Sequence, residues 1–200
     1  MEAIIVFTKN NFFCESFLSP SGCVDLSKSH KKAFVIDNII QLRVLASVIN
    51  RATFIIDDFS DDTTYMACEV IHLRRRGRDS NYIVLTGDKN AYTYIGLNKP
   101  VISKGFNRWQ LIYLLNINNS KSVYYNGDAD KNGSIRELII KELSKTLTPK
   151  DFFLLNSMKV GNYLTPNSDS KIKAIKRLYQ VRCQIGLKNQ IELNMLFSMM

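Results

Sequence analysis

The first 118 residues alternate short apolar runs with helical patterns, and this alternation constrains the fold more than any other feature. Each run is rich in Ile, Val or Phe, which is typical of strands buried on both faces of a parallel sheet. The predicted strands are Ala3–Phe7, Ala33–Ile36, Thr53–Asp57, Tyr82–Thr86 and Pro100–Ser103. The predicted helices are Asn11–Leu18, Asn38–Ile49, Thr63–Arg76, Asn90–Leu97 and Arg108–Ile117. This order indicates an α/β flavodoxin-like domain, a doubly wound parallel sheet with helices on both sides.

A polar stretch at residues 119–133 separates this part of the chain from a second, helical part. The stretch contains two glycines and shows no hydrophobic period, as is typical of a linker. The sequence therefore predicts two domains, an α/β domain at residues 1–118 and an all-α domain at residues 134–200.

Helix-start signals divide the second part into helices. Ser134 and Glu137 form the S-x-x-E pattern of a capping box, and an N-x-x-E pattern begins at Asn189. Thr148 is a favourable N-cap, and Pro149 suits the first helical position. The predicted helices begin near Ser134, Thr148, Lys171 and Asn189.

The positive charge of the chain is concentrated in its last third. Residues 131–200 contain 12 Lys and Arg against 5 Asp and Glu, which is +7 of the total +9. A polyanionic partner would gain from counterion release on such a surface, so nucleic acid is the expected partner. The alternative is a charged surface that serves only solubility. A second basic run, RRRGR at 74–78, ends a predicted helix, where cations complement the helix dipole.

Several classes of protein find no support in the sequence. The four cysteines form no CxxC pair and no zinc spacing with His30 or His72, so we expect reduced, mostly buried thiols and no metal site. The sequence shows no secretory signal pattern and no apolar run of about 20 residues that could span a membrane. We therefore expect a cytoplasmic protein. Walker A, G-x-S-x-G and G-x-G-x-x-G motifs do not occur. We therefore expect neither an enzyme nor a cofactor.

Polar residues follow the third, fourth and fifth predicted strands. They are Asp57 and Asp58, then Thr86, then Lys104. This pattern resembles the receiver domain of bacterial response regulators. The resemblance implies that Asp57, or Asp58 with a one-residue shift, is the phosphoacceptor, that the Thr86 hydroxyl follows the phosphoryl group, and that Lys104 pairs with it. The alternative is a set of turn and cap residues that coincide with the pattern.

The receiver pattern lacks its magnesium ligands. Receivers carry two acidic residues after the first strand, whereas this chain has Phe7-Thr8-Lys9-Asn10. Mg²⁺ prefers carboxylate oxygens, and phosphoryl transfer depends on the metal. We therefore expect an atypical receiver that is phosphorylated poorly or not at all. The ammonium of Lys9 either pairs with Asp57 or Asp58 or points to solvent.

The C-terminal part resembles the LuxR-type (NarL/FixJ-like) helix-turn-helix of transcription regulators. LTPKD at 147–151 matches the opening of that family, and IGLKNQIEL at 185–193 matches its closing Gly and final helix. An atypical receiver joined to this module resembles the RcsB-related enteric accessory regulators. The resemblance implies that the helix from Lys171 is the recognition helix, whose N-terminal part enters the major groove of DNA.

Helical spacing separates two faces of this predicted recognition helix. One apolar stripe recurs at intervals of three and four residues. Its members are Ala174, Leu178, Val181 and Ile185, with Ile175 at the edge. The candidate DNA-binding residues are Lys171, Lys173, Lys176, Arg177 and Gln180, because Lys and Arg reach phosphates or guanine and Gln reads adenine. The alternative is an exposed helix with solvated charges.

The interval from Leu147 to Gly186 is shorter than in the family by roughly four residues, or about one helical turn. The shortfall lies at 161–170, where the first helix of the helix-turn-helix is expected and where Pro166 disfavours a helix. That helix sets how the recognition helix docks on DNA.

Three functions remain open from the sequence. The leading hypothesis is a bacterial transcriptional regulator that binds double-stranded DNA as a homodimer, or as a heterodimer with a related regulator. The second is a protein-interaction module that pairs with or antagonises a full-length regulator without binding DNA. The third is a phospho-accepting switch that works without the usual acidic pair.

Overall fold

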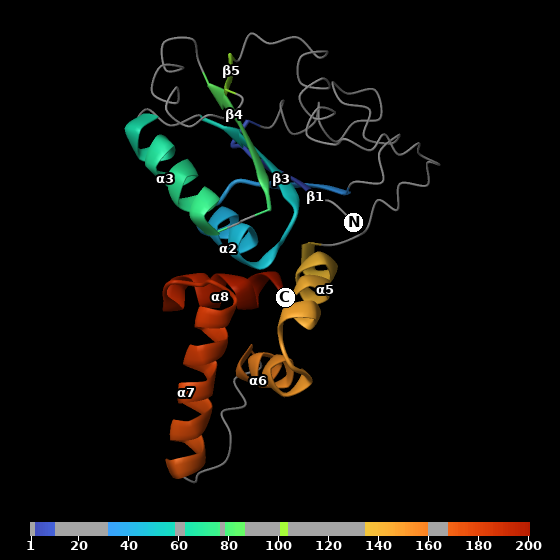
Figure 1. Ribbon diagram of the computed structural model, residues 1–200, viewed down its shortest axis with the longest axis vertical. Coiled ribbons are helices and arrows are strands. Elements are labelled where there is room, and N and C mark those ends of the chain that lie inside the picture. Colours follow the sequence, from blue (N-terminus) through green and yellow to red (C-terminus); the bar gives the residue numbers. More distant parts are fainter. Residues whose placement is uncertain are drawn as a thin grey trace, which may run out of the picture.

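Five parallel strands form the sheet of the N-terminal half (Figure 1). The computed structural model describes residues 3–10, 32–58, 63–76, 79–86, 101–103, 135–159 and 168–200. The strands are β1 Ala3–Phe7, β2 Lys32–Ile36, β3 Ala52–Asp57, β4 Asn81–Thr86 and β5 Val101–Ser103. Their order across the sheet is β2-β1-β3-β4-β5, which is the flavodoxin-like order. The predicted strand positions and the predicted sheet are confirmed.

The central strands are buried because helices and neighbouring strands cover them. Ile5 of β1 lies in register with Phe34 of β2 and Phe54 of β3, and all three side chains are buried. The ring of Phe54 stacks on the ring of Tyr82 in β4, with the ring centroids 5.0 Å apart. Continuous apolar runs without polar alternation are what such two-sided burial requires.

Two of the predicted helices of this half lie within the described residues. Helix α2, Ile39–Val48, starts where the Asn38 side chain accepts a hydrogen bond from the Ile40 amide at 2.8 Å. Helix α3, Thr63–Arg76, packs beside α2 (Figure 1). The predicted helices 11–18, 90–97 and 108–117 and the predicted linker 119–133 lie outside the described residues.

The described residues of the C-terminal half contain four helices. They are α5 Ile135–Thr146, α6 Pro149–Lys159, α7 Ser168–Gln184 and α8 Gln190–Met199. Helix α7 begins three residues before its predicted start and points away from the sheet (Figure 1). Of the stretch 161–170, residues 168–170 belong to α7, whereas 161–167 lie outside the described residues.

The two halves pack on each other rather than standing apart. Helix α8 lies against α2 (Figure 1), and buried apolar residues of both halves form one continuous cluster. The Ser47 hydroxyl of α2 donates to the Gly186 carbonyl at 3.3 Å. Arg76 at the end of α3 forms an ion pair with Glu192 of α8, with Nη2 and Oε1 3.0 Å apart. Arg76, the last residue of α3 and part of the basic run RRRGR, therefore links the two halves. Its charge also lies at the helix C-terminus, where it complements the helix dipole.

The described parts of the chain also bear on the expected burial of the cysteines and on membrane-spanning helices. Cys68 and Cys183 are free thiols, but both are exposed, so the predicted burial is wrong for these two. Within the same ranges, every helix is too short or too polar to cross a bilayer.

Candidate functional site

The receiver-like edge of the sheet is built around Asp57, the last residue of β3. Asp57 and Asp58 are both buried. The hydroxyl of Thr8, directly after β1, donates to Asp57 Oδ2 at 2.7 Å. Thr8 is itself held by its backbone amide, which donates to the Ile36 carbonyl at 3.0 Å, and its Oγ1 accepts from the Asn10 amide at 3.0 Å. A neutral hydroxyl therefore lies in direct contact with the Asp57 carboxylate.

The backbone places the fourth strand at the same edge. Asp57 pairs in register with Leu85, and the Asp58 amide donates to the Leu85 carbonyl at 2.8 Å. Thr86 is the next residue of β4, so its backbone lies where the receiver pattern requires. The side chain of Thr86 and the whole of Lys104 lie outside the described residues.

The two residues directly after β1 do not offer the ligands that magnesium prefers. The position after β1 supplies the Thr8 hydroxyl, already bonded to Asp57, and the exposed ammonium-bearing Lys9. Neither is the carboxylate oxygen that Mg²⁺ prefers. Among the described residues, no three His, Cys, Asp or Glu side chains cluster as a metal site would need. The hydrogen bond from Thr8 to Asp57 is a contact at this edge that the sequence analysis does not include.

The core-facing stripe of α7 largely matches its prediction. Leu178, Val181 and Ile185 are buried, and Ala174 is half-buried. Ile175 was expected at the edge of the stripe but is exposed.

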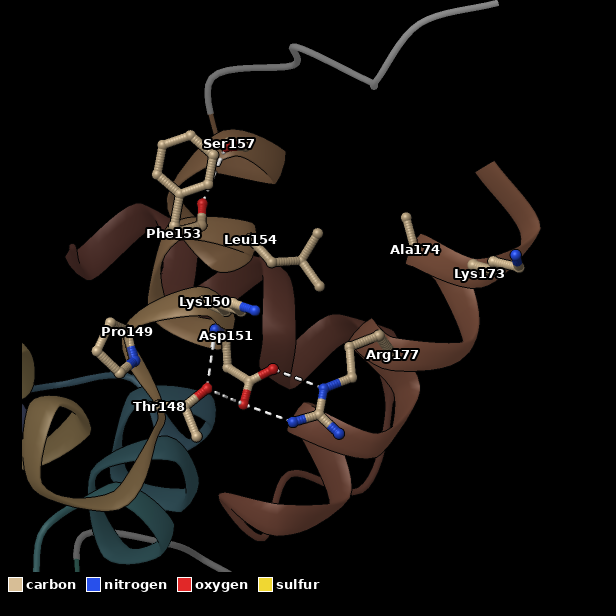
Figure 2. Close-up of a pocket in the computed structure, with 10 residues that line it drawn as sticks. All are labelled: Thr148, Pro149, Lys150, Asp151, Phe153, Leu154, Ser157, Lys173, Ala174 and Arg177. Carbon is tan, nitrogen blue, oxygen red and sulfur yellow. Dashed lines mark hydrogen bonds and ion pairs between the residues drawn. The ribbon is translucent and has the colours of Figure 1, made fainter. Parts of the chain in front are cut away.

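The candidate DNA-binding residues of α7 divide into two groups. Lys173 and Lys176 are exposed on the helix. Arg177 instead makes a bidentate ion pair with Asp151 of α6, in which Nε and Oδ1, and Nη2 and Oδ2, are each 2.6 Å apart (Figure 2). Arg177 Nη1 also donates to Gln180 Oε1 at 3.2 Å. The side chain of Lys171 lies outside the described residues.

Asp151 links this ion pair to the start of α6. The Asp151 amide donates to Thr148 Oγ1 at 3.3 Å, and that hydroxyl donates to Asp151 Oδ2 at 2.6 Å, which confirms Thr148 as the N-cap (Figure 2). The side chain of Asp151 is 3% exposed, whereas that of Arg177 is 49% exposed. Hydrogen bonds from Arg177 and then Thr148 hold the pKa of Asp151 below its usual value. The pair anchors α7 to α6.

A third face of α7 exposes large apolar side chains. Ile172, Ile175 and Tyr179 recur at intervals of three and four residues and are all exposed. The guanidinium carbon of Arg182 lies 4.8 Å from the centroid of the Tyr179 ring. The outward surface of α7 is therefore partly cationic and partly apolar.

Comparisons with known proteins do not assign the chain to a family. Neither a protein-family model nor a curated protein sequence matches it. Among solved structures, the chain is similar to a protein assigned as CpaE2, a pilus assembly protein from Sinorhizobium meliloti 1021, at 10% identity. That similarity has a TM-score of 0.46 and covers 58% of this chain and 98% of the other.

Two of these site contacts were missed in the sequence, for different reasons. Thr8 had a usable signal, because a hydroxyl directly after a central strand lies at the carboxyl edge of the sheet. The contact between Arg177 and Asp151 had no such signal in the sequence, because the two residues are 26 positions apart. They meet only through the packing of α6 on α7.

Proposed function

We propose that the protein is a bacterial cytoplasmic transcriptional regulator that binds double-stranded DNA through the outward face of α7. The observation that carries this proposal is the exposure of Lys173 and Lys176 on a helix that points away from the body of the protein (Figure 1). Lysines in this setting attract phosphates at low desolvation cost, and the +7 charge of residues 131–200 adds a long-range attraction.

Arg177 serves this function as a positioning residue. Its guanidinium is held by the buried carboxylate of Asp151, so it fixes α7 on α6. Gln180 is held beside it by the hydrogen bond from Arg177 Nη1. The direct contacts with DNA are therefore assigned to Lys173 and Lys176, together with Lys171 at the start of the helix.

The receiver-like half is proposed to act without phosphorylation. Asp57 is buried and accepts a hydrogen bond from the Thr8 hydroxyl, and the residues after β1 do not suit the metal that phosphoryl transfer uses. The half then serves as a rigid support for the C-terminal helices, in a homodimer or in a heterodimer with a related regulator.

A second function, a protein-interaction module, is favoured by a different observation. Ile172, Ile175 and Tyr179 are exposed along one side of α7, next to the cationic side. Exposed apolar rows of this kind commonly mark protein-binding surfaces. In this reading α7 pairs with another regulator and does not read DNA.

A salt-titrated DNA-binding measurement on the full chain separates the two functions. The wild type is compared with Lys173→Ala/Lys176→Ala and with the control Lys141→Ala, an exposed lysine of α5. If α7 binds DNA, the double variant lowers affinity and reduces the slope of log K against log salt by about 2, because each phosphate contact contributes about 0.9. The control is expected to match the wild type.

Specific regulation also predicts that affinity depends on DNA sequence. An unchanged slope in the double variant, or no binding at low salt, would contradict the DNA-binding proposal. Binding of equal strength to every sequence would favour the protein-interaction module.

A further inference from the structure

A groove of about 830 Å³ lies between α6 and α7 (Figure 2), and its lining includes none of the exposed apolar residues Ile172, Ile175 and Tyr179. Its apolar lining comes from Phe153 and Leu154 of α6 and Ala174 of α7. Leu154 points across the groove toward Ala174 (Figure 2). Phe153 is 71% exposed, which is unusual for a side chain of this size. The groove therefore offers apolar surface that the described part of the chain leaves open.

Positive charge surrounds this apolar lining. Lys150 of α6 and Lys173 of α7 both line the groove and are both exposed. The carboxylate of Asp151 also lines it, but the bidentate contact with Arg177 neutralises that charge. The net charge presented to an occupant is therefore positive.

We propose that this groove binds an amphipathic helix of a protein partner that carries Asp or Glu beside its leucine or aromatic side chains. Amphipathic helices bind in grooves between helices by placing apolar side chains, spaced three and four residues apart, against the apolar lining. Here those side chains would contact Phe153 and Leu154, and the flanking carboxylates would meet Lys150 and Lys173. Charge complementarity of this kind selects the partner and speeds association.

The dimensions of the groove agree with a short helical segment. Its lining runs along α6 from Thr148 to Ser157. Nine residues of helix rise by about 14 Å, so the groove has room for between two and three turns of a partner helix.

Two other occupants suit the groove less well. A DNA backbone would gain from the lysines, but its phosphates gain nothing from the exposed ring of Phe153. A second copy of this chain that docked groove to groove would bring its own lysines toward Lys150 and Lys173, and like charges at an interface oppose association. An acidic helix satisfies both the charge and the apolar surface.

The proposal does not depend on DNA binding by α7, and the test keeps the two separate. The probe is a fluorescein-labelled synthetic peptide of fourteen residues with Leu at helical spacing and Glu at the flanking positions. Binding to the full chain is followed by fluorescence anisotropy. The control peptide has Lys in place of each Glu.

Phe153→Ala is the main variant, because an exposed side chain can be truncated without loss of folding, as circular dichroism would verify. We expect the acidic peptide to bind saturably and Phe153→Ala to weaken binding about tenfold, as for an anchor residue at the centre of an interface. Lys150→Glu should also weaken binding, while Asn156→Ala, at an exposed position of α6 outside the groove, should not.

Two results would overturn the proposal. One is the absence of saturable binding of the acidic peptide, or equal binding of the control peptide. The other is displacement of the peptide by duplex DNA together with indifference to Phe153→Ala, which would make the groove a phosphate-binding surface. The salt slope for DNA in Phe153→Ala should equal that of the wild type, so failure of one proposal leaves the other testable.

Discussion

The ion pair between Arg76 and Glu192 allows a quantitative test of how the two halves are joined. The side chains of Arg76 and Glu192 are 9% and 2% exposed, and their nearest charged atoms are 3.0 Å apart. Arg76 Nη1 also lies 3.4 Å from the Ser47 hydroxyl, and Glu192 Oε2 accepts from the Lys188 amide at 2.8 Å. We predict that Arg76→Ala strongly destabilises the whole protein.

The magnitude follows from the burial of Glu192. Removing one partner of a buried pair typically costs about 3–5 kcal/mol, because the other charge stays buried without compensation. Glu192 would keep its hydrogen bond from the Lys188 amide, so the lower end of this range, about 3 kcal/mol, is expected for Arg76→Ala. The double variant Arg76→Met/Glu192→Leu should cost less than the sum of Arg76→Met and Glu192→Leu made singly, by about 2 kcal/mol.

Urea denaturation followed by circular dichroism at 222 nm measures these free energies, with hydrogen exchange to follow α2 and α8 separately. Arg75→Ala is the matched control, since Arg75 is exposed on the same helix and its loss should change stability by less than about 0.5 kcal/mol. A loss in Arg76→Ala that stays within that margin would show that the ion pair contributes little to stability. Simple addition of the effects of Arg76→Met and Glu192→Leu would show the same.

Further predictions concern the receiver-like edge, the start of α6 and the turn before α8. Thr8→Val removes a hydrogen bond to Asp57 and should lower the free energy of unfolding by about 1 kcal/mol in urea melts, whereas Thr8→Ser should not. Incubation with acetyl phosphate should leave the intact mass unchanged, and a phosphorylated species absent from Asp57→Asn would contradict this. The hydrogen bond from Arg177 lowers the pKa of Asp151. The ion pair between Asp151 and Arg177 therefore stabilises the folded protein fully above the ordinary carboxyl pKa of about 3.9. This stabilisation is lost as the pH falls through the lower pKa that Asp151 has in the folded protein. Asp151→Asn should remove this acid-sensitive component of stability in a circular dichroism titration, and an unchanged titration would contradict the assignment. Gly186 has φ +80°, so Gly186→Ala should cost about 1 kcal/mol in thermal or urea melts; a neutral effect would show that the turn relaxes.

The strands were predictable because their signal is local. A run such as β3 is apolar over consecutive residues, and two-sided burial in a parallel sheet leaves that pattern in the sequence. The same holds for the N-cap at Thr148, where the preferred residue type lies next to Pro149 and three residues before Asp151.

The charged contacts were not predictable, because their partners are distant in the sequence. Arg76 and Glu192 are 116 residues apart, and only the packing of α3 and α8 on the same helix, α2, brings them together. The edge of a helical stripe is also poorly determined by spacing alone, which is why Ile175 faces solvent. The contact between Thr8 and Asp57 differs from these, because the position of a hydroxyl directly after a central strand could have indicated it.

The shared core of α2 and α8 has a consequence for how the protein is turned over in a cell. A fragment that ends before α5 would leave the α8-facing side of α2 in water, and a fragment that begins at α5 would expose the opposing side of α8. Cleavage between the halves would expose apolar surface on both pieces, and a lower stability of each piece raises its susceptibility to proteolysis. The amount of folded α7 would therefore follow the amount of uncut chain.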